Sequence, residues 1–187
     1  FPVVLGGMIG GIALSFAVAG GGRRLAALTA YAVAAGALTV GVLQGWLGIL
    51  QAAPWANIAA FSLAFAAIGA PIIACAALIG RGGVAFGPVV FLLFANPISA
   101  AAQPVEFLPE PWGAVGQWFP PGAAATLVRG LSYFPAADLS FPWAVLLGWA
   151  AAGFVLAGVA TLLHRERVAG EREETIVTVE PALTGVA

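Results

Sequence analysis

Five long stretches of this sequence carry almost no charge, and each is long enough to cross a bilayer. They cover about residues 1–20, 25–50, 58–79, 84–102 and 141–163. A membrane-spanning helix needs about 20 apolar residues, because the hydrocarbon core is about 30 Å thick. The pattern predicts an all-α fold class: a polytopic membrane helix bundle over residues 1–167 with about five transmembrane helices.

The overall composition excludes several other classes. Of 187 residues, 61% are hydrophobic and only 8% are charged, against about 25% charged in an average soluble domain. A very apolar soluble core domain is the alternative, but so few charges would not cover its surface. The net charge of −1 offers no electrostatic basis for nucleic-acid binding, so we expect no nucleic-acid partner.

The arginines predict which way the chain crosses the membrane. Arg23 and Arg24 follow the first stretch, Arg81 follows the third, and Arg165 and Arg167 follow the fifth. If each stretch crosses once, all of these lie on one side, and basic residues mark the cytoplasmic side. We therefore expect a multi-pass protein of the cell (plasma) membrane with a cytoplasmic C-terminus. Tryptophans are typical of membrane interfaces, and five fall at the opposite interface: Trp46, Trp55, Trp112, Trp118 and Trp143.

The two ends of the sequence differ in character. The last 20 residues, 168–187, are polar and acidic before a short TIVTVE run, which predicts a disordered cytoplasmic tail. The sequence begins at Phe1 with no basic segment before its first apolar stretch. We therefore expect residues 1–187 to belong to a longer protein.

Residues 103–140 form the most informative segment, because prolines interrupt it too often for a simple span. Asn96-Pro97 should break the fourth stretch, and two short helices are expected near residues 113–119 and 123–134. This predicts an outer helical hairpin of re-entrant type. One interpretation is a gate or cap over a pathway between spans, and the other is a loop lying on the bilayer surface. The candidate gate and hinge residues are Asn96, Pro97, Glu106, Pro109, Trp112, Pro120, Pro121 and Arg129.

Small residues recur at four-residue spacing in the first and last stretches. Gly7 and Gly11 share one helix face, and Gly148 and Ala152 share another. Such faces let helix backbones approach closely. They predict helix packing either inside one bundle or between subunits.

Nothing in the sequence points to catalysis. His164 is the only histidine and stands at a predicted membrane edge, while Cys75 is the only cysteine. No apolar stretch carries a pair of acidic residues, and no phosphate-binding GxxxxGK[ST] run occurs. We therefore predict no enzyme activity, no catalytic residue, no metal site and no cofactor.

A longer run carries a family resemblance. Residues 94–134, FANPISAAAQPVEFLPEPWGAVGQWFPPGAAATLVRGLSYF, precede an apolar span containing Leu147-Gly148-Trp149. This arrangement resembles the C-terminal membrane part of ABC-2-type permease-like proteins, and more closely the YhgE/Pip-like membrane proteins of actinobacteria. The resemblance implies an export or cell-envelope role, dimers, and a separate cytoplasmic ATPase. The turns at residues 20–24 and 80–83 are too short to hold the amphipathic coupling helix of such permeases.

Two functions follow as hypotheses. The first is a permease-like membrane subunit of a transport or export system that moves a lipid or cell-envelope component. The alternative is a non-catalytic scaffold subunit, packed through its small-residue faces into a larger membrane complex. The expected partners are membrane lipids, other membrane subunits or a second copy of the chain, and an ATPase.

Overall fold

The computed structural model describes the main chain of residues 1–184 and the side chains of residues 1–163. The described residues are helical with turns and loops between the helices, and they contain no strand, so the all-helical prediction is confirmed. In chain order the helices are α1 (Pro2–Ala17), α2 (Gly21–Val40), η1 (Gly41–Trp46), α3 (Pro54–Ile79), η2 (Gly80–Ala85), η3 (Gly87–Ala95), η4 (Val105–Phe107), α4 (Trp112–Gly116), α5 (Pro120–Tyr133) and α6 (Ser140–Thr184).

Helix α3 is the centre of the bundle. It packs against α1, α2, α5 and α6, and every residue from Ala64 to Ala74 is buried. A helix that is apolar on all sides is expected in the interior of a bundle. Its small residues allow the neighbours to come close: an added Cβ at Gly11 of α1 would lie 3.0 Å from the Gly69 Cα atom.

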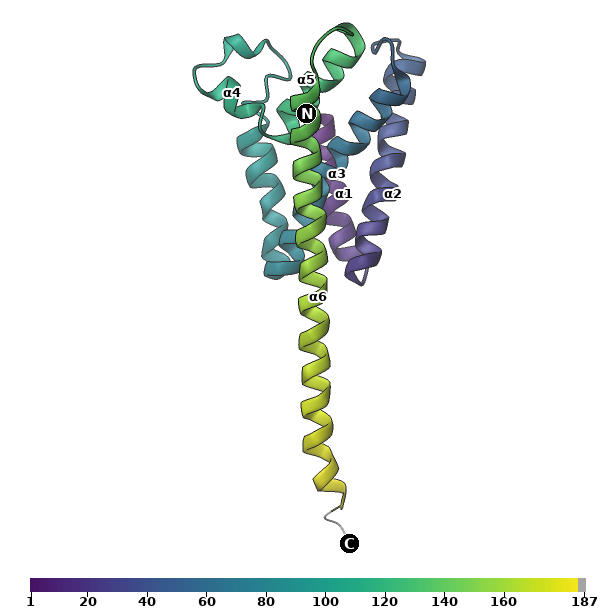
Figure 1. The fold of residues 1–187 in the computed structure, drawn as a ribbon, viewed down its shortest axis with the longest axis vertical. Coiled ribbons are helices and arrows are strands. Elements are labelled where there is room, and N and C mark those ends of the chain that lie inside the picture. The colour runs from purple at the N-terminus through teal and green to yellow at the C-terminus, as the bar shows by residue number, and fades with distance from the viewer. Residues whose placement is uncertain (185–187) are drawn as a thin grey trace.

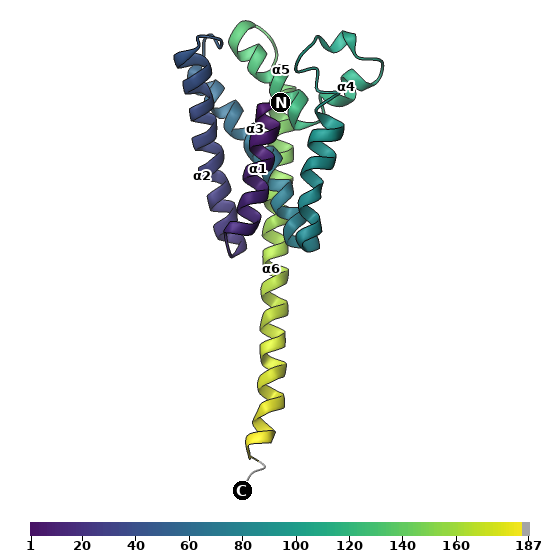
Figure 2. The same cartoon turned by 180° about the vertical axis from the view of Figure 1, so that it is seen from behind.

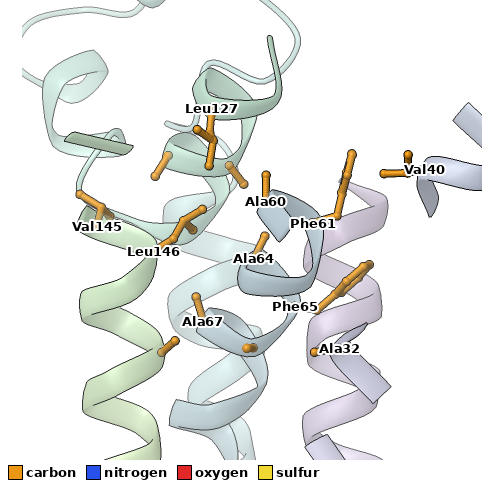
Figure 3. Packing of buried hydrophobic residues seen from close by; sticks show 14 of the residues in the cluster. Ala32, Val40, Ala60, Phe61, Ala64, Phe65, Ala67, Leu127, Val145 and Leu146 are labelled. Carbon is orange, nitrogen blue, oxygen red and sulfur yellow. The ribbon is translucent and has the colours of Figure 1, made fainter. Parts of the chain in front are cut away.

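Larger side chains fill the space around the part of α3 that lies near α5. Phe61 and Phe65 of α3 lie beside Val40 and Ala32 of α2, while Leu127 of α5 and Leu146 of α6 approach α3 from the other side (Figure 3). Helix α5 therefore belongs to the same apolar core as α2, α3 and α6.

Three helices are long and apolar enough to cross a membrane: Gly21–Trp46, Pro54–Ala85 and Ser140–Leu163. Helix α1 has 16 residues, which corresponds to about 24 Å of helix. In place of the expected fourth span, η3 covers only Gly87–Ala95, and the chain turns immediately after it. The fold thus supplies three candidate spans by length and composition, and five spans stay a prediction.

The last helix extends further than we expected. The fifth stretch was expected to end near residue 163 and a disordered tail to begin at residue 168, but α6 continues to Thr184. Arg165 to Glu174 consist largely of arginine, glutamate and alanine, which favour helix, so helix can continue beyond the apolar part. The last three tail residues, 185–187, lie outside the described residues.

The connections separate into two ends of the bundle (Figures 1 and 2). The α1–α2 turn and η2 lie at one end, and α6 continues beyond that end. The η1–α3 loop, α4 and α5 lie at the other. We call these the arginine end and the α5 end, because Arg23 and Arg24 lie in the first turn of α2 and Arg81 is in η2. The arginine-bearing turns therefore share one end, as the sequence argument requires.

Candidate functional site

The helical path of the backbone ends abruptly at the end of η3, at the α5 end of the bundle, and we call residues 96–101 the break. The Asn96 N–H donates to the Phe91 carbonyl at 3.0 Å, which continues the wide helical turn by one residue. Pro97 has no N–H to extend the helix. The Ser99 hydroxyl then donates to the Asn96 carbonyl at 2.7 Å, and Ala100 adopts a left-handed φ of 53°. The break expected at Asn96-Pro97 is thus present, and an alanine in a strained conformation completes it.

Two consecutive prolines begin α5. Proline suits the first helical turn because its N–H would be unpaired there and its φ is already helical. Both Pro120 and Pro121 are buried. Gly122 lies close to the Gly116 carbonyl, and Gly116 lies close to the Ile98 carbonyl. Because no side chain fits at either glycine, the start of α5 packs directly on the end of α4, and the end of α4 packs on the break after η3.

A chain of polar contacts holds α5 to this break. The Gln117 amide donates to the Ser99 carbonyl at 3.4 Å, and its oxygen accepts a hydrogen bond from the Thr126 hydroxyl at 2.6 Å. The Arg129 guanidinium donates to the Ala101 carbonyl at 3.3 Å.

A cavity of about 290 Å³ lies between α5, this break and the start of α1. The wall is mainly apolar, and Asn96, Ser99, Arg129 and Tyr133 supply its polar groups. The hydroxyl of Tyr133 also donates to the Ile49 carbonyl, which fixes α5 to the η1–α3 loop. We call this space the α5 cavity; the lining includes Phe1, Val3, Val4, Leu50, Phe61, Pro121, Ala124 and Val128.

The structure brings together only part of the predicted gate set. Asn96, Pro121 and Arg129 line the α5 cavity, and Pro120 is buried beside it. Exposed Pro97 follows Asn96 at the break. The rest, Glu106, Pro109 and Trp112, are exposed in the segment through η4 and α4 and are not among the residues lining the cavity.

Trp112 has an aromatic contact in place of a cavity contact. Its ring lies edge-to-face on Phe94, with ring centroids 6.1 Å apart. It therefore anchors the outlying segment to η3.

Sequence reasoning missed a buried amide cluster at the same end. Asn57, in the first turn of α3, is 0% exposed. Its amide donates to the Gln44 side-chain oxygen at 3.1 Å and to the Ala52 carbonyl at 3.3 Å, while its own Oδ1 has no partner. Amides are rare inside apolar stretches, and that signal could have singled out Gln44, whereas Asn57 lies just before the third stretch and gives no such signal.

The predicted packing residues divide between two environments. Gly7 and Gly11 lie against Ile68 and Gly69 of α3, inside the bundle. Gly148 and Ala152 are exposed on α6. They line an open groove of about 590 Å³ whose aromatic walls are Trp118, Phe141 and Trp149.

Comparison with protein-family models, with curated proteins and with solved structures yields no match for this chain. Among the residues that the structure describes, no group of three metal-ligating side chains lies together. The α5 cavity and the placement of the apolar helices are therefore the features that bear on function.

Proposed function

We propose that the protein is a permease-like membrane subunit of a transport or export system that moves a lipid or another cell-envelope component. Three candidate spans support a membrane location. The observation that carries the proposal is the α5 cavity. It lies beside α5, a short helix with non-helical residues before and after it. Its mixed lining, apolar with a few polar groups, suits an amphipathic molecule.

The geometry suggests how α5 would act as the gate. Its contacts with the rest of the α5 end include a few hydrogen bonds, such as those from Arg129 and Tyr133 to main-chain carbonyls. Each such hydrogen bond contributes only about 1 kcal/mol, and the apolar contacts of α5 with α3 and α6 would have to shift when α5 moves. The segment from the break at residues 96–101 through α5 would move as one gate, and the cavity would open toward the α5 end. Five spans, a cytoplasmic C-terminus, a plasma-membrane location, an ATPase partner and a YhgE/Pip-like relationship belong to this proposal.

A lock across the cavity tests the gate. In a Cys75→Ser background, Ala101→Cys and Arg129→Cys would be joined by a short, cleavable bifunctional thiol reagent. The protein is purified with the partners that accompany it from the membrane, reconstituted in vesicles, and assayed for movement of a fluorescent phospholipid. We expect movement to stop on cross-linking and to return on cleavage.

A single-cysteine control separates the lock from chemical damage. The Ala101→Cys variant alone keeps Arg129 and the main-chain carbonyl that it contacts, and after treatment with the same reagent it should keep the activity of its untreated form. Movement that continues after complete cross-linking of the double variant would overturn the gate, and a lack of lipid movement by the unmodified protein would overturn the proposed function.

The exposed groove on α6 favours the scaffold as a second candidate. Close approach of another helix needs small residues, and Gly148 and Ala152 face outward with no Cβ neighbour at Gly148. A scaffold predicts that Gly148→Leu releases a co-purifying membrane protein, while the cross-link at the α5 cavity changes nothing. If Gly148→Leu retains every partner, the scaffold is excluded at this face.

A further inference from the structure

A second cavity lies at the arginine end, and the α5 cavity lies at the other end of the bundle. Its volume is about 570 Å³, and it lies between the α1–α2 turn, the end of α3 and α6. This size is within the range of about 300–1,000 Å³ typical of ligand sites. We call it the arginine cavity; its lining is Gly20, Gly21, Gly22, Arg23, Arg24, Ile73, Ala76, Ala77, Ala157, Ala160 and Thr161.

The lining is divided into a cationic side and an apolar side. Arg23 and Arg24 come from the first turn of α2, and among residues 1–163 they are the only charged residues that line the cavity. Ile73 of α3 and Ala157 and Ala160 of α6 form an apolar wall. The cavity can therefore bind an anionic group on one side and a hydrocarbon chain on the other.

The two arginines have different roles. Arg24 is partly buried, and its Nε donates to the Val18 carbonyl at 2.6 Å. This hydrogen bond satisfies a carbonyl at the end of α1 and fixes the position of the guanidinium. The terminal nitrogens of a guanidinium still carry four donors. Arg23 is exposed and can move toward an anion. A fixed arginine beside a mobile one suits the oxygens of a phosphate group.

Glycines keep the cavity open. Gly21 contacts Thr161 so closely that a Cβ would collide with the threonine hydroxyl, so the turn packs directly on α6. A Cβ at Gly22 would meet no atom within 4 Å. Gly22 is exposed, so a larger side chain can be placed on this lining residue without a backbone clash.

We propose that the arginine cavity binds one anionic phospholipid, with its phosphate at Arg23 and Arg24 and an acyl chain along the wall of α3 and α6. The location suits a lipid, because basic pockets between spanning helices on the cytoplasmic side bind lipid headgroups. The apolar wall distinguishes a lipid from a free anion, which would gain nothing from it. This binding does not depend on transport through the α5 cavity.

The test is native mass spectrometry of the full chain in detergent, with phosphatidylglycerol or phosphatidylcholine added. We expect one phosphatidylglycerol molecule to stay bound and phosphatidylcholine to be lost. Arg23→Gln should lower its occupancy about tenfold, as expected for loss of a charged hydrogen bond. Arg81→Gln removes the same charge at the same end outside the cavity lining, and it should change occupancy by less than about twofold because exposed charges are screened.

A second variant and a second ligand complete the test. Gly22→Leu keeps both arginines but puts a bulky side chain on a residue of the cavity lining, and it should also release the lipid. If Arg23→Gln or Gly22→Leu does not elute as a folded particle, the remaining folded variant alone decides the test. Equal losses in Arg23→Gln and Arg81→Gln, equal retention of both lipids, or displacement of the lipid by inorganic phosphate alone would overturn the proposal.

Discussion

The contact between α6 and α3 at Gly153 gives the sharpest test of the fold. An added Cβ at Gly153 would lie 2.6 Å from the Pro71 nitrogen and 2.7 Å from the Ala70 Cβ. Comfortable carbon contacts are about 3.5–4.0 Å long, so the two helices would have to separate by about 1 Å. Neither partner is the end of a flexible side chain, and neither can move without its helix.

The expected magnitude follows from this clash. Overpacking a closely packed interior costs about 1–3 kcal/mol, and we expect Gly153→Ala to destabilise the protein by that amount. At about 2–4 °C per kcal/mol for a chain of this size, its melting temperature in detergent falls by about 2–12 °C. Gly158→Ala is the matched control on the same helix, because its Cβ would meet nothing within 4 Å.

The assay is thermal unfolding in one detergent, followed by loss of the monodisperse peak on size exclusion. Gly158→Ala should match or exceed the parent protein, since alanine favours helix by about 1 kcal/mol over glycine. If Gly153→Ala is as stable as Gly158→Ala, α6 does not pack on α3 as described, and the reasoning fails.

Three further changes test the α5 end. Asn57→Asp removes the amide that donates to the Gln44 oxygen and buries a carboxyl among acceptors, so we expect it to destabilise by about 1–3 kcal/mol in the same thermal assay. Trp149→Phe removes an indole N–H that donates to a main-chain carbonyl between α4 and α5 at 2.9 Å, and it should speed proteolysis of the segment before α5. The Ser140 N–H donates to the Asp138 carboxylate and lowers its pKa. The stabilisation from Asp138 is therefore present above its unfolded pKa of about 3.9 and lost as pH falls through the lowered folded value. Asp138→Asn should show a smaller fall in melting temperature between pH 5 and pH 2.5.

Sequence patterns predicted the all-helical class and the common end of the arginine-bearing turns, because charge and hydropathy report directly on solvent. The break at Asn96-Pro97 and the two short helices that follow it were also predicted, since proline acts through its own backbone. These features depend on local chemistry, and local chemistry is visible in a sequence.

Neighbour relations were not predictable in the same way. Gly11 and Gly148 stand in the same small-residue spacing, yet one contacts α3 and the other faces outward. Hydropathy does not separate a lipid neighbour from a protein neighbour, because both are apolar. The central position of α3 and the packing of α5 into the core therefore became visible only in the fold.

The same limit applies to the candidate site. Asn96 and Arg129 were singled out for their chemistry and do line the α5 cavity, whereas Glu106 and Trp112 were chosen in the same way and lie outside its lining. The separation depends on how α4 and α5 fold back on η3, which the spacing of prolines does not specify.

The central claim is that apolar helices carry the chain across a bilayer with the arginine end on the cytoplasmic side. Single cysteines in a Cys75→Ser background test it with a membrane-impermeant maleimide on intact cells. We expect Gln51→Cys and Gln103→Cys to be labelled from outside, and Gly82→Cys, in the turn after α3, only after permeabilisation. Labelling of Gly82→Cys in intact cells alongside Gln103→Cys would contradict the account.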